Sequence, residues 1–133
     1  MAIHMGLCTL HALFTRPAMF QTWLAASPSI WYRERVVLDG IDGFKRRVAA
    51  LPAKPSLMLA AGALEQPSTA NGPLQGRDAI AAARRMVDNA RELGERLQKT
   101  NTLARVQFHL LAHEDHGSAT FPAMARGLEF FLT

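Results

Sequence analysis

The sequence has few of the residues that mark disulfide-rich, membrane-bound or nucleic-acid-binding proteins. Cys8 is the only cysteine, so no disulfide can form within the chain, and we expect its thiol to be buried as a small apolar group. There is one tyrosine, and aromatic residues do not alternate with basic ones as they do on surfaces that stack bases. The apolar start, Met1 to Phe14, has no basic leading segment and is too short to span a bilayer. We therefore expect a cytoplasmic protein that binds neither nucleic acid nor membrane.

What is present suits one compact domain. The chain has 133 residues, of which 49% are apolar and 20% are charged, a balance typical of soluble proteins with a core. The formal net charge of +4 is spread along the chain instead of forming a basic block. We expect residues 1–133 to form a single domain with a solvated, mixed-charge surface.

Three short apolar segments have the character of buried strands. Each is bounded by proline, glycine or polar residues, and in the third segment apolar and polar residues alternate. The predicted strands are Phe20–Ala26, Ser56–Gly62 and Ala104–Leu111. Apolar strands of this length are typical of a sheet that is covered on both faces.

Helical periodicity occurs before, between and after these strands. The predicted helices are Leu7–Phe14, Ile41–Leu51, Asp78–Lys99 and Pro122–Phe131. The third is the strongest, because apolar residues recur in it at steps of three and four; in the last, Met124, Leu128 and Phe131 share one side. This alternation predicts an α/β fold with three layers, α/β/α, around a short and mostly parallel sheet.

Residues able to carry chemistry follow each predicted strand. Ser29 and Trp31 follow the first strand in SPSIW, Glu65 follows the second, and His116 follows the third in AHEDHGS. The carboxyl ends of parallel strands meet at one edge of a sheet, so these side chains are expected close together. An acid after one late strand and a histidine after the last also match the chain order of an α/β-hydrolase triad, in which the carboxylate orients the imidazole and the imidazole takes a proton from the nucleophile.

Longer segments around these residues carry a family resemblance. LHALFTRPAMFQTWLAASPSIWY resembles the segment that follows the nucleophile elbow in enterochelin-esterase-like α/β-hydrolases, HEDHGSATFPAMARGLEFFL resembles their histidine loop and last helix, and AGALEQ is similar to their acid-bearing turn. The resemblance runs from Gly6 onward and covers the C-terminal part of such an enzyme. It implies that His116 is the catalytic base and Glu65 the acid, and that Ser29 and Trp31 lie near the substrate pocket.

The sequence departs from this family where the nucleophile is expected. Members carry Gly-x-Ser-x-Gly-Gly before the first helix considered above, whereas this chain has Met5 at a glycine position and Ile3 at the serine position. The strands and oxyanion-hole loop that precede the elbow have no counterpart in these residues. We therefore expect a partial hydrolase domain that lacks the N-terminal half. The family reaction is hydrolysis of siderophore-like or other carboxylic esters through an acyl-enzyme, and we expect the chain alone to be inactive.

Several alternatives remain open at this level. Asp115 is a rival to Glu65 as the acid. Without the family resemblance, Glu65 is interpreted as a solvated loop carboxylate. His109, His113 and His116 suggest a metal site, but their spacing does not complete a ligand set, and we expect neither a metal nor another cofactor. The chain is alternatively a non-catalytic assembly module derived from an esterase, or one half of a split esterase.

The missing half also predicts self-association. In the family's sheet the strand read here as Phe20–Ala26 is interior, so this chain leaves one side of it unpaired, with no proline or lysine inside it to discourage pairing. The helix Leu7–Phe14 loses part of its apolar cover for the same reason. We expect a homo-oligomer formed through that strand or through the N-terminal helix.

Overall fold

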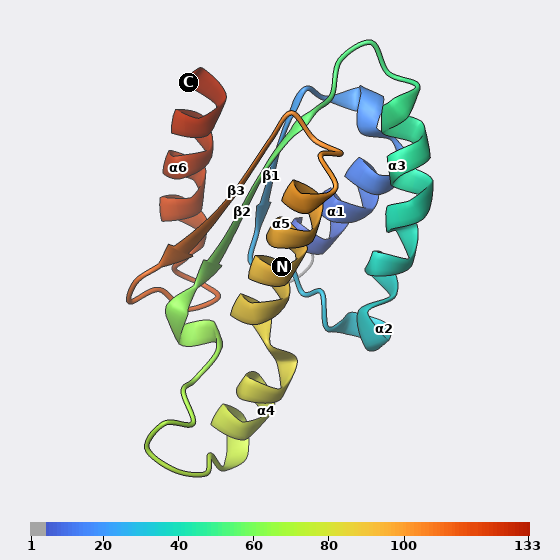
Figure 1. The fold of residues 1–133 in the computed structure, drawn as a ribbon. Helices are drawn as coiled ribbons and strands as arrows, with labels where there is room; N and C mark the ends of the chain where they lie inside the picture. The colour runs from blue at the N-terminus through green and yellow to red at the C-terminus, as the bar shows by residue number, and fades with distance from the viewer. Residues whose placement is uncertain (1–4) are drawn as a thin grey trace.

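The computed structural model describes residues 5–133, in which helices and strands alternate along the chain (Figure 1). The strands are β1 (Thr22–Ala26), β2 (Ser56–Gly62) and β3 (Arg105–Leu111). The α-helices are α1 (Met5–Thr15), α2 (Tyr32–Arg35), α3 (Ile41–Ala49), α4 (Gly76–Arg84), α5 (Met86–Lys99) and α6 (Thr120–Leu132). Shorter 3-10 turns, η2 to η4, cover Pro17–Met19, Val36–Gly40 and Ala63–Glu65.

The three strands form one parallel sheet in the order β1-β2-β3. In register, Ala26 lies beside Ala60, and Ala60 lies beside His109. The carboxyl ends of all three strands therefore lie at the same edge of the sheet, as the sequence predicted.

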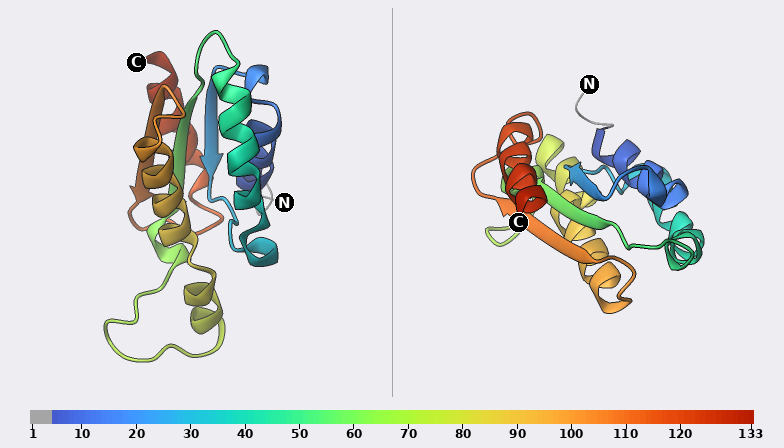
Figure 2. Two further views of the ribbon diagram at one scale, coloured as in Figure 1. Left: turned by 45° about the vertical axis from the view of Figure 1, so that its right-hand side comes forward. Right: turned by 90° about the horizontal axis from the view of Figure 1, so that it is seen from above.

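Helices cover both faces of this sheet (Figure 2). On one face, α1, α3 and α5 bury a large core that includes Trp23 and Ala25 of β1. On the other face, α6 buries a smaller core against Met58 and Ala60 of β2. Every residue of β2 is buried, because it is the central strand and is covered on both sides. The predicted α/β/α architecture with a short parallel sheet is confirmed.

The first strand is shorter than predicted. It begins at Thr22 instead of Phe20, because Pro17 opens a 3-10 turn that delays the extended backbone. Phe20 is largely exposed, with its ring edge-on to Trp23. The Trp23 Nε1–H donates to the Phe20 carbonyl at 2.8 Å, which holds this turn against the strand.

The long helix predicted over Asp78–Lys99 is two helices. The backbone turns left-handed at Arg85 (φ 50°), which separates α4 from α5. Helix α5 buries seven residues against β2 and β3, whereas α4 buries none and extends past the end of the sheet (Figure 1). A periodic pattern alone does not show where the sheet that a helix covers comes to an end.

The structure shows which side of α6 faces the sheet, and the expectation that Cys8 is buried is wrong. In α6 the side with Met124, Leu128 and Phe131 is exposed, and the side with Ala123, Gly127 and Phe130 faces the sheet. Small residues bring this helix close to β1, since a Cβ on Gly127 would press on Leu24. Cys8 is exposed as well, because it lies on the side of α1 opposite the one that carries Leu10, Leu13 and Phe14 into the core. Within residues 5–133, none of the helices is both long and apolar enough to cross a membrane.

Candidate active site

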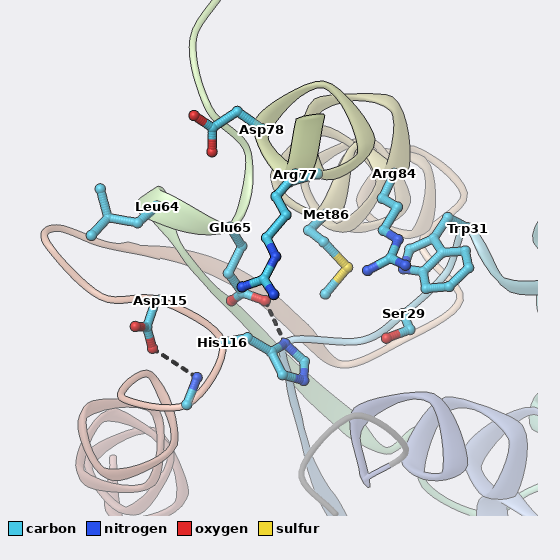
Figure 3. Close-up of a pocket in the computed structure, with 12 residues that line it drawn as sticks. Ser29, Trp31, Leu64, Glu65, Arg77, Asp78, Arg84, Met86, Asp115 and His116 are labelled. Carbon is cyan, nitrogen blue, oxygen red and sulfur yellow. Dashed lines mark hydrogen bonds and ion pairs between the residues drawn. The ribbon is translucent and has the colours of Figure 1, made fainter. Parts of the chain in front are cut away.

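Three side chains from consecutive strand ends meet at one point. Ser27 directly follows β1, Glu65 ends the turn after β2, and His116 lies in the loop after β3. Figure 3 shows Glu65 and His116 pointing toward one another at the edge of a cavity. The sequence predicted that Glu65 and His116 would lie close together at this edge of the sheet, and the structure joins them by a direct hydrogen bond.

The Glu65 carboxylate is held by three donors. Oε1 accepts from the Ser27 hydroxyl at 2.6 Å and from the Gly62 backbone N–H at 2.7 Å. Oε2 lies 2.7 Å from Nδ1 of His116. The Glu65 side chain is only 2% exposed, so these bonds replace the water that a buried carboxylate needs.

This bonding determines the state of the imidazole. An ionised carboxylate only accepts hydrogen bonds, so Nδ1 of His116 carries the hydrogen and the neutral ring keeps its lone pair on Nε2. Within residues 5–133, Nε2 has no hydrogen-bond partner. Nε2 is thus a buried ring nitrogen to which the hydrogen bond with Glu65 leaves no partner among these residues.

A glycine allows the histidine loop to pass close to β2. A Cβ on Gly62 would collide with the carbonyl oxygen of Glu114. The same carbonyl accepts from the backbone N–H of Leu64 at 3.0 Å. The turn that carries Glu65 and the loop that carries His116 are thus joined through their backbones as well as their side chains.

Asp115, the rival for the acid, has a different task. Its Oδ1 accepts from the backbone N–H groups of Gly117 and Ser118, each at 2.8 Å. These hydrogen bonds hold the pKa of the Asp115 carboxyl below its usual range. Asp115 shapes the turn that leads into α6, while the His116 ring bonds Glu65.

Glu65 and His116 line a cavity of about 730 Å³. Ser29 and Trp31, which the resemblance places near a substrate pocket, line this cavity together with Glu65 and His116. Helix α4 contributes Arg77 and Arg84, and the Arg84 guanidinium lies 4.4 Å from the centre of the Trp31 ring. In the part of the chain that the structure describes, neither arginine forms an ion pair, so both positive charges are available to a ligand.

Sequence reasoning missed Ser27, Arg77 and Arg84. Ser27 had a usable signal, since it directly follows a predicted strand and is the first residue of SPSIW, but the resemblance implied a role only for Ser29 and Trp31 of that motif. The arginines had none, because their place over the cavity depends on the break at Arg85.

Two other sequence hypotheses concern the nucleophile and a metal. Ile3, at the position of the family's serine, lies outside the described residues. His109 Nε2 lies 3.1 Å from the Gln107 side chain, and His113 lies in a left-handed turn. Among residues 5–133, no three His, Cys, Asp or Glu side chains are placed to hold a metal ion together.

A parallel sheet with an acid and a histidine at neighbouring strand ends defines an α/β-hydrolase. No family model matches the chain. Among curated proteins, it is 37% identical to the siderophore enterobactin esterase of Emericella nidulans (94% of this chain, 43% of the relative) and 34% identical to the ferri-bacillibactin esterase of Bacillus subtilis (96% and 39%). The structure of a siderophore hydrolase from Aspergillus nidulans superimposes with a TM-score of 0.81 at 37% identity, over 95% of this chain and 44% of that one.

The chain belongs to the enterochelin-esterase-like family of α/β-hydrolases and corresponds to the C-terminal part of such a protein. It spans less than half the length of the relatives that it matches.

Proposed function

We propose that this chain provides the acid and the histidine of a serine-type carboxylic-ester hydrolase. The observation that carries the proposal is the Glu65–His116 pair, with Nδ1 bonded to a buried carboxylate at 2.7 Å and Nε2 left without a partner in residues 5–133. In this role Nε2 takes the proton of a nucleophilic hydroxyl while its oxygen attacks the ester carbon, and the imidazolium then returns the proton to the departing alcohol. Glu65 stabilises the imidazolium between the two transfers.

The isolated chain is proposed to be inactive, because the serine position carries Ile3. Removing a triad nucleophile lowers turnover by on the order of a million-fold. Purified chain should therefore hydrolyse 4-nitrophenyl acetate no faster than its His116→Ala variant. Saturable hydrolysis that is lost in the variant would mean that a nucleophile lies within these residues, and Ser29 would be tested first.

The acid–histidine pair is testable without turnover. An imidazole N–H donated to a buried carboxylate gives a proton resonance far downfield, so one such signal is expected from His116 by NMR. Glu65→Gln should remove the signal, and Asp115→Asn should leave it. If the signal were lost in Asp115→Asn but kept in Glu65→Gln, the carboxylate bonded to His116 would be Asp115 and the proposed pair would be wrong.

For the substrate, we propose siderophore-type esters that carry negative charge. The named activities of the relatives support the siderophore class, and the unpaired Arg77 and Arg84 beside Trp31 favour an anionic group in the cavity. Monomethyl succinate should shift the Trp31 indole resonance at lower concentration than dimethyl succinate. The double variant Arg77→Gln/Arg84→Gln should abolish that difference, and equal binding of both probes to the unmodified chain would contradict an anionic preference.

A further inference from the structure

The start of α5 is capped by a residue from a distant part of the chain. The first turn of a helix has backbone N–H groups without partners inside the helix, and the Arg85 side chain forms no capping hydrogen bond there. Instead, the Asp88 backbone N–H donates to Oε1 of Gln66 at 2.9 Å. In return, Nε2 of Gln66 donates to the Asp88 carboxylate at 2.7 Å. Gln66 therefore fastens the turn after β2 to the first turn of α5.

The end of α4 is tied to the same first turns of α5. Asn89, which is 6% exposed, donates from its side-chain amide to the Arg84 carbonyl at 3.1 Å. The left-handed Arg85 separates the two helices, and its guanidinium reaches along α5 to Asn89 and Glu92. The direction in which α4 leaves α5 is thus set at the place where Gln66 caps α5.

Helix α4 has little else to fix its direction. None of its residues is buried, and it extends past the end of the sheet (Figure 1). Figure 3 shows Arg77 and Arg84 projecting from it toward the cavity, with Arg84 beside Trp31. The Arg84 guanidinium lies 4.4 Å from the centre of the Trp31 ring, but an exposed contact of this kind is weak. The place of both positive charges at the cavity therefore depends on the junction of α4 and α5.

We propose that Gln66 is a positioning residue for the anionic group of the substrate. By capping α5 it fixes the break at Arg85, and the break holds the arginines of α4 at the cavity. Because Gln66 directly follows Glu65, the same cap keeps the acid-bearing turn and the arginine-bearing helix at a fixed separation. The inference rests on the proposed function for the charge of the ligand, but the position of α4 is measurable without any ligand.

The first measurement follows the Trp31 indole resonance by NMR in the full chain without ligand. Arg84→Gln removes the charge over the ring and gives the position of the resonance when that contact is lost. Gln66→Ala should move the resonance toward that position, because the uncapped first turn of α5 no longer fixes the break. Gln98→Ala is the matched control and should leave the resonance in place. Gln98 Nε2 donates to the Val106 carbonyl at 3.0 Å near the other end of α5, so this variant loses a glutamine hydrogen bond of the same helix away from the junction.

A reciprocal exchange separates the two hydrogen bonds from a general loosening of the fold. Gln66→Glu should displace the Trp31 resonance, since two carboxylates then face each other. In Gln66→Glu/Asp88→Asn the carboxylate at position 66 accepts from both the backbone N–H and the side-chain amide at position 88, so the resonance should return to its original place. The downfield His116 signal should remain in every variant, because its carboxylate partner is unchanged.

The second measurement compares the binding of monomethyl succinate and dimethyl succinate, followed by the same resonance. Arg77 and Arg84 are exposed, so the unmodified chain should prefer the charged ester by about fivefold. Gln66→Ala should bind the two esters equally, whereas Gln98→Ala should keep the preference. Gln66→Glu/Asp88→Asn should restore it.

The results distinguish the positioning role from the proposed substrate. A Trp31 resonance that Gln66→Ala does not move, or that Gln98→Ala moves as far, overturns the positioning role. If the resonance moves as expected but the unmodified chain binds both esters equally, the positioning role is supported and the anionic substrate is contradicted. If Gln66→Ala does not fold, Gln66→Glu is compared with Gln66→Glu/Asp88→Asn, and equal displacement of the resonance in the two overturns the inference.

Discussion

Ser27 is a strained residue that supports a buried charge. Its backbone is left-handed (φ 45°), which is unfavourable for any residue with a side chain, yet its hydroxyl donates to Glu65 at 2.6 Å. Because Ser27 directly follows β1, the strain places the hydroxyl where the buried carboxylate needs a donor. The site thus depends on a residue that is neither acid nor base.

Two substitutions separate the hydrogen bond from the strain. Ser27→Ala loses the bond to a charged group and should destabilise the fold by about 1.5–3 kcal/mol. Ser27→Gly loses the same bond but relaxes the left-handed backbone, so it should cost about 1 kcal/mol less. Urea unfolding of the three proteins measures both differences, and a glycine variant less stable than the alanine variant would contradict this account.

Asp115 predicts a pH dependence. Its folded-state pKa is held below the ordinary value of 3.8 by the N–H groups of Gly117 and Ser118, so it adds stability above that value and loses it as the pH falls through the lower folded value. Asp115→Asn should therefore unfold at a lower urea concentration than the unmodified chain at neutral pH. This difference in urea midpoint should disappear in acid, below about pH 3.8. A difference in urea midpoint that does not change with pH would show that the charge of Asp115 does not contribute to stability.

At the scale of elements, the contact between β2 and the histidine loop decides the site. Gly62→Ala places a methyl group against the Glu114 backbone, which cannot move without displacing His116, and should cost about 1–3 kcal/mol. Gly40→Ala is the matched control, because its new methyl group meets Phe14 at an ordinary 3.5 Å. Thermal unfolding compares the two. Equal stabilities would mean that the loop yields easily.

The elements were predicted well where a strand or helix has one consistent environment. Ser56–Gly62 matches β2 at both ends, since a central strand is apolar throughout. The error at Arg85 falls where the environment changes within one pattern, because the sheet beneath the helix ends there. In α6 the pattern left open which side faces the sheet, and the side with Met124, Leu128 and Phe131 is exposed. A hydrophobic pattern identifies surfaces to be covered but does not say which other element covers them.

At the scale of the molecule, the position of the apolar strand β1 at the edge of the sheet and the exposed Met124, Leu128 and Phe131 of α6 predict that the chain self-associates. Pairing of two β1 edges across a two-fold axis would satisfy both strands at once. Exchange of the N-terminal helix is a second route to a dimer. Light scattering at micromolar concentration should show a dimer that Leu128→Glu dissociates. Ile80→Glu, a control at an exposed position of α4, should leave the dimer intact. A stable monomer would rule out self-association.

The sequence by itself determined the α/β class and the three strands, because these follow from local apolar patterns. It also placed Glu65 and His116 after neighbouring strands, while their roles as acid and base were implied by the family resemblance. The tertiary structure alone decided between Glu65 and Asp115, since that choice depends on which carboxylate reaches the imidazole across the ends of β2 and β3. It also placed Ser27 against Glu65, placed Arg77 and Arg84 at the cavity, and turned the side of α6 with Met124, Leu128 and Phe131 outward. Distances between residues far apart in the chain are set by packing, which no local pattern contains.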